Sequence, residues 1–197
     1  GRWMDLPRLL KKQGCGGEDL SWPTMSSNSS SSSSTPASLV GQDLHTLWGD
    51  VPVRVAGGGG DSSEWDLAQL LRGRVALFSV PAAFSPTCSE RHIPGVVASA
   101  QAMLDKGVDT IVCLSCNDVF VMRAWWKELG ADPKLHMLCD GDAALVKQLG
   151  LSMEIPGMGT RAQRFAMLVD KGIIQHVAVD PPGTLQDSTA EAILAKL

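Results

Sequence analysis

Residues 75–97 read VALFSVPAAFSPTCSERHIPGVV, and this stretch decides the fold. The first six residues are mostly apolar and rich in strand formers, which predicts a buried strand over 75–80. From 89 to 105, apolar side chains recur at steps of three and four residues, the spacing of one helix face, and Gly107 is placed to end that helix. A strand and a helix joined by a short loop that contains Cys88 are therefore the unit around which the rest of the chain is arranged.

The alternation of strands and helices continues beyond this unit. Further strands are predicted at 108–114, 135–139, 164–169 and 173–179, and further helices at 118–129, 142–149 and 187–196. The last two strands are separated by Asp170-Lys171-Gly172, a tight-turn sequence, so we expect them to form an antiparallel hairpin. This order predicts an α/β fold with a mixed central sheet and helices on both faces, for which a thioredoxin-like topology is the nearest common match.

Composition and charge exclude several classes of function. The 197 residues, of which 44% are hydrophobic, suffice for one domain around one core. A net charge of −4 and an isoelectric point of about 5.5 offer no broad basic surface for nucleic acid or an anionic membrane. No apolar run reaches the roughly 18 residues of a membrane-spanning helix. We therefore expect a soluble protein that acts on a small neutral molecule.

The N-terminal stretch differs in composition from the rest of the chain. It opens with a mildly basic segment and continues into a serine-rich run at 26–34, with no pattern that would form a core. We expect a disordered tail over 1–38 and a single domain over 39–197. Serine and basic residues favour an organelle transit peptide, whereas three acidic residues favour a plain tail or upstream-translated sequence.

The cysteines direct attention to reactivity rather than to structural disulfides. Their number is odd and their spacing is unlike that of a secreted disulfide framework: Cys15, Cys88, Cys113, Cys116 and Cys139. Cys88 opens a helix directly after a strand, where unpaired backbone N–H groups and the helix dipole favour a thiolate over a thiol. We expect this sulfur to be nucleophilic and accessible. Ser85 stands three residues earlier, the spacing of a redox C-x-x-C turn, so its hydroxyl is expected to donate to the sulfur.

The segment Cys113-Leu114-Ser115-Cys116 has the form of a C-x-x-C motif. A zinc site would need two further ligands of similar local spacing, and the four histidines are scattered. Strand cysteines are usually small buried hydrophobic residues. We therefore expect neither a metal nor a cofactor.

The loop around the cysteine resembles a known active-site signature. The pattern P-x-x-x-[T/S]-x-x-C after the first core strand is similar to that of the peroxiredoxins. Three runs narrow the resemblance to the type II, or peroxiredoxin 5-like, subfamily over roughly 39–197: PAAFSPTCSERHIPG at 81–95, KGVDTIVCLSCNDVFVMRAW at 106–125 and RAQRFAMLVD at 161–170. The resemblance implies a thioredoxin-like fold and a thiol-dependent peroxidase. Such an enzyme reduces hydrogen peroxide and organic hydroperoxides to water and alcohols through a cysteine sulfenic acid.

The same resemblance implies the roles of individual residues. Cys88 is the peroxidatic cysteine, Ser85 stands where most relatives have threonine, Pro81 shields the pocket, and Arg164 completes it. A guanidinium beside a thiolate stabilises the negative charge and can donate to the peroxide oxygens as charge develops. A structural ion pair is the alternative role for Arg164, and Arg161 is the alternative candidate for its place.

A second thiol must reduce the sulfenic acid before it oxidises further. Cys113 lies 25 residues after Cys88, the position of a second cysteine in type II relatives, which permits an internal disulfide. Its place in a predicted buried strand would require local unfolding for that bond to form. Because no cysteine follows Cys139, the C-terminal resolving thiol of many animal relatives has no counterpart. We therefore expect an external reductant, glutaredoxin with glutathione or thioredoxin.

His92, one turn after Cys88, has two interpretations. It could serve as the base of a Cys/His pair. Because a peroxidatic thiol is already ionised by its surroundings, we instead expect His92 and Pro94 to shape the helix near the pocket. The resemblance also implies a homodimer formed through loops at the active-site end of the sheet.

Two other functions and the cellular location stay open at this stage. A thioredoxin-like binding or chaperone module without catalysis would retain Cys88 only as a helix cap. The other is an oxidoreductase acting on protein disulfides, but Ser85 stands where its usual resolving cysteine would be. The tripeptide Ala195-Lys196-Leu197 fits the small-basic-leucine pattern of a peroxisomal address, so peroxisome and cytosol are both expected locations.

Overall fold

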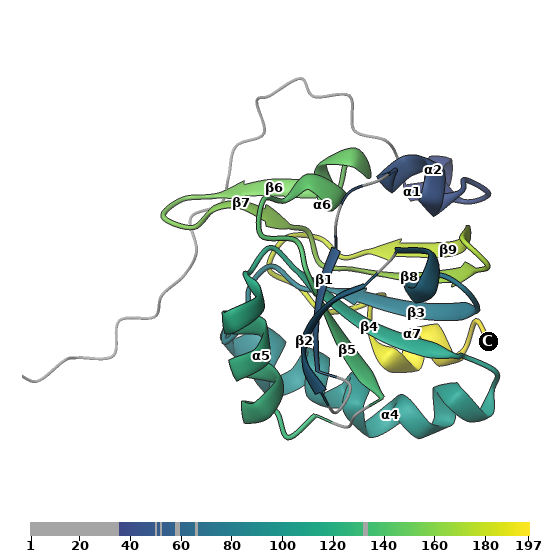
Figure 1. Ribbon diagram of the computed structural model, residues 1–197, viewed down its shortest axis with the longest axis horizontal. Helices are drawn as coiled ribbons and strands as arrows, with labels where there is room; N and C mark the ends of the chain where they lie inside the picture. Colours follow the sequence, from purple (N-terminus) through teal and green to yellow (C-terminus); the bar gives the residue numbers. More distant parts are fainter. Residues whose placement is uncertain (1–35, 50, 52, 58–59, 66, 132–133) are drawn as a thin grey trace, which may run out of the picture. The chain divides into compact units, whose positions relative to one another are not determined.

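A seven-stranded sheet organises the protein in the computed structural model (Figure 1). The structure describes residues 36–49, 51, 53–57, 60–65, 67–131 and 134–197. The strands are β1 (Val53–Gly57), β2 (Gly60–Trp65), β3 (Arg74–Ser79), β4 (Thr110–Ser115), β5 (Leu135–Cys139), β6 (Ser152–Ile155), β7 (Gly159–Ala162), β8 (Phe165–Asp170) and β9 (Ile173–Val179). The helices are α1 (Pro36–Leu39), α2 (Leu44–Trp48), α3 (Leu67–Leu70), the π-helical turn η1 (Cys88–His92), α4 (Ile93–Asp105), α5 (Val119–Glu128), α6 (Ala144–Gln148) and α7 (Ala190–Leu194).

The sheet is mixed, in the order β2-β1-β5-β4-β3-β8-β9. The three central strands β3, β4 and β5 run parallel, whereas β1 and β8 pair antiparallel on either side of them. The strands β6 and β7 form a separate two-stranded ribbon. The predicted mixed sheet is therefore confirmed, with the parallel strands at its centre.

Side chains of the central strands alternate between two apolar layers. On β3, Val75 and Leu77 pack with α1, α2, α3 and α6, whereas Ala76 and Phe78 pack with α4, α5 and α7. Figure 1 shows α1, α2 and α6 above the sheet and α4 and α7 below it. The connections through α4 and α5 step in the same direction from β3 to β4 to β5. Right-handed crossovers therefore place both helices on one face. The expected helices on both faces are confirmed.

The β8–β9 hairpin forms as predicted, and its turn explains the chain reversal. Lys171 and Gly172 are the two central residues, with φ of 50° and 86°. Positive φ at both positions is the two-residue turn whose twist matches the flanking strands, and glycine adopts it without strain. The hairpin places β8 beside β3, which is the pairing that later brings distant residues to Cys88.

Some elements differ from those the sequence predicted. The final helix is shorter than 187–196, because Thr189 is extended and caps α7 by accepting from the backbone N–H of Ala192. The hairpin of β1 and β2 was not predicted, and neither was the β6–β7 ribbon. The side chains of β6 are partly exposed, so that strand carries no clear apolar alternation.

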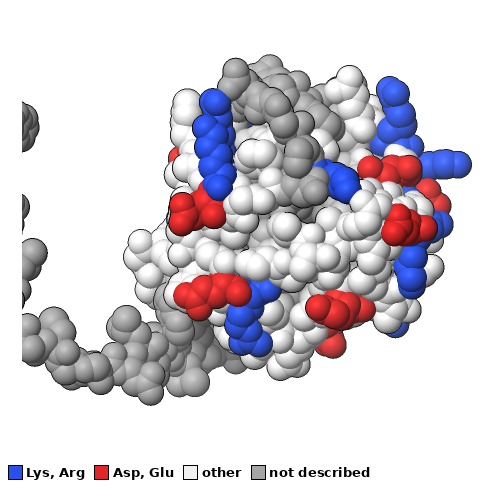
Figure 2. All heavy atoms as spheres, turned by 90° about the horizontal axis from the view of Figure 1, so that it is seen from below, with Lys and Arg blue, Asp and Glu red and all other residues white. Residues whose placement is uncertain are grey.

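The predicted tail over 1–38 lies almost entirely outside the described residues, and its boundary stays a prediction. Within the described part of the chain, none of the helices combines the length and hydropathy needed to cross a bilayer. On the face shown in Figure 2, acidic and basic side chains are mixed and separated by uncharged surface.

Candidate active site

The loop that follows β3 delivers Cys88 to the first turn of a helix. Phe84 has a positive φ of 61°, an unusual conformation for a side chain of its size, and this bends the loop just before the helix. Helical residues begin at Pro86, where a missing N–H costs nothing because the first turn has no partner for it. The carbonyl of Cys88 accepts from the N–H of Ile93, so this segment is wound as a π-helical turn. Such turns are frequent at functional sites.

Arg164 reaches the sulfur because of the pairing between β3 and β8. The two strands are antiparallel, with Ser79 opposite Phe165, so the start of β8 lies beside the end of β3. The guanidinium Nη2 of Arg164 then donates to the Sγ of Cys88 at 3.4 Å, across 76 residues of sequence. The structure therefore brings together the cysteine and the arginine that the sequence singled out.

Arg161 does not take this place. Its Nε donates to the carbonyl of Met158 at 3.0 Å and its Nη1 to the carbonyl of Cys116 at 3.1 Å. The first bond lies within the β6–β7 ribbon, and the second ties the ribbon to the loop after β4. Arg161 therefore holds backbone, while the guanidinium of Arg164 faces Cys88.

His92 makes two hydrogen bonds, and neither is to the sulfur. Its Nδ1 lies 2.9 Å from the Nη1 of Arg164, and its Nε2 lies 2.9 Å from the carbonyl oxygen of Ser188. Burial lowers the pKa of His92 to about 4, and the positive charge of Arg164 acts in the same direction. With both ring nitrogens engaged elsewhere, His92 is not placed to take a proton from Cys88.

Asp180 fixes the segment that receives His92. Its carboxylate accepts from the backbone N–H groups of Gln186, Asp187 and Ser188 and from the hydroxyl of Ser188, at 2.6–3.1 Å. The backbone N–H of Asp180 donates to the carbonyl of Arg164 at 2.9 Å. One buried residue thus organises the turn before α7 through its carboxylate and the backbone of Arg164 through its N–H.

Ser85 does not make the expected bond to the sulfur. Its hydroxyl donates to the carbonyl of Ala82 at 2.9 Å, so the expected donation to Cys88 is wrong. The single hydrogen of the hydroxyl is engaged by a carbonyl of its own loop, three residues back. The serine oxygen keeps its lone pairs and can still accept from a bound molecule.

Other residues hold the loop in place. The side-chain oxygen of Asn117 accepts from the backbone N–H of Ala83 at 3.0 Å and from the hydroxyl of Ser115 at 2.8 Å. The indole N–H of Trp125 donates to the hydroxyl of Ser89 at 2.9 Å, which ties α5 to η1. Pro81 begins the loop half-buried, and its shielding role stays a prediction.

The sulfur of Cys88 is less accessible than the sequence suggested. The residue is wholly buried, and Arg164 is 8% exposed, so the expectation of an accessible thiol is wrong for this conformation. Three neighbouring elements, the loop, β8 and α4, close over it.

The remaining described cysteines have different surroundings. Cys113 in β4 is wholly buried below the sheet, and burial raises its pKa well above the ordinary value, with Cys88 contributing in the same sense. Cys116, directly after β4, belongs to the opposite apolar layer, because it lies three positions, an odd number, after Cys113 and side chains alternate between the faces of a sheet. Burial likewise raises the pKa of Cys116 and of Cys139 to about 12. Cys113 and Cys116 therefore do not share one site.

Sequence reasoning missed the supporting residues Asn117, Trp125, Asp180 and Ser188. An Asp with a Ser eight residues later in a turn is a weak signal. Asp180 and Ser188 meet the site through the β3–β8 pairing and the packing of α7 on α4, whereas Asn117 and Trp125 reach it from the loop after β4 and from α5. A search for capping carboxylates could have found Asp180, but not what it supports.

Comparison with known proteins agrees with this geometry. A model of the Redoxin family matches residues 50–194. The chain is 38% identical over 143 residues to chloroplastic peroxiredoxin-2E of Arabidopsis thaliana, covering 70% of this chain and 61% of that protein. It is 40% identical over 126 residues to peroxiredoxin-2C of the same organism, covering 63% and 78% respectively. Reduced Prx3 of Vibrio vulnificus, solved in complex with H2O2, is 38% identical with a TM-score of 0.72 over 80% of this chain and 97% of that one.

The chain has a mixed sheet, and a buried cysteine begins the helix after β3 and faces a guanidinium. These features define a thiol protein of the thioredoxin-like fold. The chain spans less than two thirds of the length of the chloroplastic relative. The matches nonetheless cover nearly all of the described domain. The chain belongs to the peroxiredoxin family, in its type II, peroxiredoxin 5-like branch.

Proposed function

We propose that this protein is a thiol-dependent peroxidase that reduces hydrogen peroxide and alkyl hydroperoxides. The observation that carries the proposal is the 3.4 Å contact between the Nη2 of Arg164 and the Sγ of Cys88 at the first turn of a helix. A charged donor and the helix dipole both stabilise a thiolate. A relative of similar fold was solved with H2O2, which supports the substrate class.

The first chemical step is an attack by the thiolate of Cys88 on one peroxide oxygen. A sulfur–oxygen bond forms, the O–O bond breaks, and the leaving oxygen takes a proton and departs as water or an alcohol. Sulfur loses two electrons and becomes a sulfenic acid, while the peroxide is reduced. The guanidinium of Arg164 stabilises the charge that moves to the leaving oxygen, and Ser85 can accept a hydrogen bond from the peroxide.

The second half of the cycle uses an external thiol. A thiol condenses with the sulfenic acid to release water and form a mixed disulfide, which a second thiol then reduces. We propose glutaredoxin with glutathione, or thioredoxin, rather than Cys113. Cys113 lies in the middle of β4, wholly buried, and its raised pKa keeps it protonated and weakly nucleophilic.

One assay tests the peroxidase proposal. Purified protein should consume H2O2 in the presence of dithiothreitol, and Cys88→Ser should not. A dimedone adduct on Cys88, found by mass spectrometry after peroxide treatment, would identify the sulfenic acid. Unchanged turnover by Cys88→Ser would refute the assignment of Cys88 as the nucleophile. No turnover by the wild type would refute the proposal and favour a binding module in which Cys88 only caps a helix. Parallel kinetics with glutaredoxin and thioredoxin would separate the two reductants.

We also propose a homodimer formed at the active-site end of the sheet. Phe84 and Phe120 are 52% and 79% exposed, and Trp125 lies under Phe84 with ring centroids 6.4 Å apart. Exposed aromatic side chains are typical of interface cores. Sedimentation velocity should show a dimer for the wild type and a monomer for Phe84→Ser combined with Phe120→Ser. A wild-type monomer would contradict this part of the proposal.

The location in the cell is proposed to be the cytosol or the peroxisome, on the basis of Ala195-Lys196-Leu197. Leu197 packs partly against the apolar layer below the sheet, so a receptor would need to draw it out. A fluorescent fusion at the N-terminus separates the locations, because a punctate peroxisomal signal supports import and a diffuse signal supports the cytosol.

A further inference from the structure

The side chain of His92 bridges the arginine at the site and the segment before α7. Its Nδ1 lies 2.9 Å from Arg164 and its Nε2 lies 2.9 Å from the carbonyl of Ser188, and the residue is 2% exposed. The ring also meets Phe78 edge-on, with centroids 6.1 Å apart and planes at 81°. These contacts fix the ring on three sides.

The two hydrogen bonds admit one protonation state of the ring. A guanidinium only donates, so the Nδ1 of His92 must be the unprotonated nitrogen. A carbonyl only accepts, so Nε2 must carry the hydrogen. The ring is therefore neutral, and it presents a lone pair to Arg164 at a fixed position.

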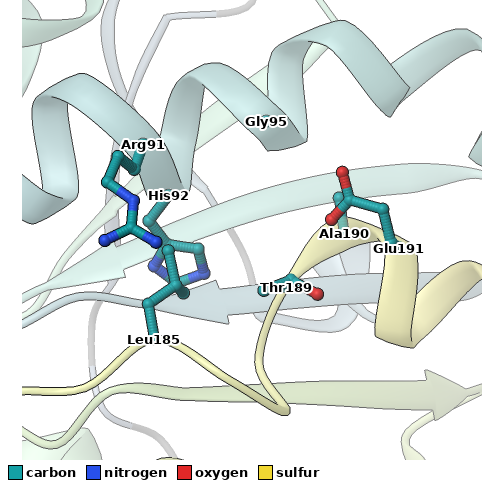
Figure 3. A pocket seen from close by; sticks show the side chains of 7 residues that line it. All are labelled: Arg91, His92, Gly95, Leu185, Thr189, Ala190 and Glu191. Carbon is teal, nitrogen blue, oxygen red and sulfur yellow. The ribbon is translucent and has the colours of Figure 1, made fainter.

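The anchor for this ring is itself held firmly. The carbonyl of Ser188 belongs to a turn whose N–H groups and hydroxyl all bond to the carboxylate of Asp180. Figure 3 shows His92 leaving its helix toward the segment that carries Leu185 and Thr189. A hollow of about 220 Å³ adjoins the ring and is lined by the residues labelled there. A substituted side chain at position 92 therefore has room.

Resting on the proposed peroxidase function, we propose that His92 is the positioning residue of Arg164. Its neutral Nδ1 holds one arm of the guanidinium, so that the other arm points at the sulfur of Cys88. Without this acceptor the long arginine side chain is free to rotate its donors away from the sulfur. The hydrogen bonds of His92 go to Arg164 and Ser188 and not to the sulfur, so it acts through the arginine.

Two substitutions separate the halves of the bridge. In His92→Asn the side-chain oxygen replaces Nδ1 and can accept from Arg164, while the bond to Ser188 is lost. In His92→Gln the amide nitrogen replaces Nε2 and can donate to Ser188, while the acceptor for Arg164 is lost. His92→Phe keeps a ring of similar shape and loses both bonds.

The proposal predicts a ranking of these variants by their rate of H2O2 turnover with dithiothreitol. His92→Gln and His92→Phe should lose about tenfold to hundredfold in kcat/KM, the scale of a misplaced catalytic group. His92→Asn should recover most of that loss. Alkylation of Cys88 by iodoacetamide should slow in the same order, because the reagent reports the thiolate held by Arg164. A loss shared equally by Asn, Gln and Phe would overturn the proposal.

An Arg164→Ala background distinguishes positioning from a general structural role. If His92 acts through the arginine, His92→Phe should add less than about a twofold loss to Arg164→Ala, because residues that share one interaction are not additive. Thermal unfolding of each variant checks that it is folded. If His92→Phe does not fold, His92→Gln replaces it in the double-mutant cycle, because that variant also lacks the acceptor for Arg164. Full multiplicative losses in the double variant would refute the proposal.

Failure of this proposal differs from failure of the peroxidase proposal. If wild-type protein consumes no peroxide, the function itself is wrong, and the alkylation order still tests His92. If wild-type protein is active and needs Arg164, but His92→Gln matches it in rate, only the positioning role is wrong.

Discussion

Two buried sulfurs in one apolar layer have opposite chemical surroundings. Cys88 and Cys113 are both wholly buried, and both belong to the cluster below the sheet. Cys88 stands at the first turn of a helix with a guanidinium 3.4 Å away, whereas Cys113 lies within β4 among apolar neighbours, and burial raises its pKa. The difference teaches that burial alone suppresses a thiol, and that oriented donors decide which buried sulfur can react.

Removal of the first sulfur should have the largest effect. Cys88→Ser keeps the approximate size of the side chain but replaces the sulfur of the proposed nucleophile with a hydroxyl oxygen. We expect H2O2 turnover to fall to background, whereas Cys113→Ala keeps it within about twofold, because a strand thiol that stays protonated contributes little. Stopped-flow peroxide loss with dithiothreitol measures both. Equal losses in the two variants would remove the distinction between the sulfurs.

Removal of the guanidinium should make Cys88 resemble Cys113. In Arg164→Gln the sulfur keeps its place on the helix but loses the charged donor, and we expect kcat/KM for H2O2 to fall about a thousandfold, the scale of a lost electrostatic stabiliser. Arg161→Gln is the matched control, because that arginine bonds to the carbonyls of Met158 and Cys116. A control that falls as far as Arg164→Gln would show that the two arginines were assigned wrongly.

The chemical difference can be read directly from labelling rates. A brief pulse of iodoacetamide on native protein, followed by peptide mass spectrometry, should label Cys88 at least about a hundredfold faster than Cys113, because only thiolates react at an appreciable rate. Unfolding in denaturant should bring the two rates close together. Comparable rates in the native protein would mean that the surroundings of Cys88 do not activate it.

The local chemistry of Cys88 could be predicted from sequence, but its partners could not. A strand, a short loop and a helix follow one another in the chain, so the cysteine at a helix start is a local pattern. The approach of Arg164 depends on Ser79 lying opposite Phe165, a register between strands far apart in sequence. The choice between Arg164 and Arg161 therefore rested on resemblance to a family and not on residue pattern.

The burial of Cys88 and the bond made by Ser85 were predicted wrongly for the same reason. Both depend on how the loop folds against β8 and α4, which local spacing does not specify. His92 was correctly separated from a role as base, yet its link to Ser188 through the turn held by Asp180 could not be foreseen. The helices and strands were predicted best in the part of the chain where βαβ units follow one another regularly.

Acid should lower the free energy of unfolding through His92, which lies in the same buried site as Cys88. The pKa of His92 is about 4 in the folded protein against an ordinary value of 6.5. Between those values the unfolded chain binds a proton that the folded protein excludes, so the free energy of unfolding falls as the pH falls. The loss should approach about 3 kcal/mol near pH 4, at about 1.4 kcal/mol per pKa unit. Denaturant unfolding of wild type and His92→Asn across this range isolates the contribution, since both share every other titrating group. If the free energies of unfolding of the two proteins fell equally with pH, the contribution of His92 would be contradicted.

The smallest effect should come from Ser85, whose hydroxyl donates to Ala82 and leaves its lone pairs for a bound peroxide. Ser85→Ala should lower kcat/KM for H2O2 by about tenfold, the effect of one neutral hydrogen bond at about 1 kcal/mol or slightly more. Ser85→Thr keeps the oxygen and adds a methyl that limits its rotation, so the rate should change by less than about threefold. Because neither variant alters the guanidinium, Cys88 should stay far more reactive toward iodoacetamide than Cys113 in both. If Ser85→Ala removed that selectivity, the hydroxyl and not Arg164 would be the feature that distinguishes the two sulfurs.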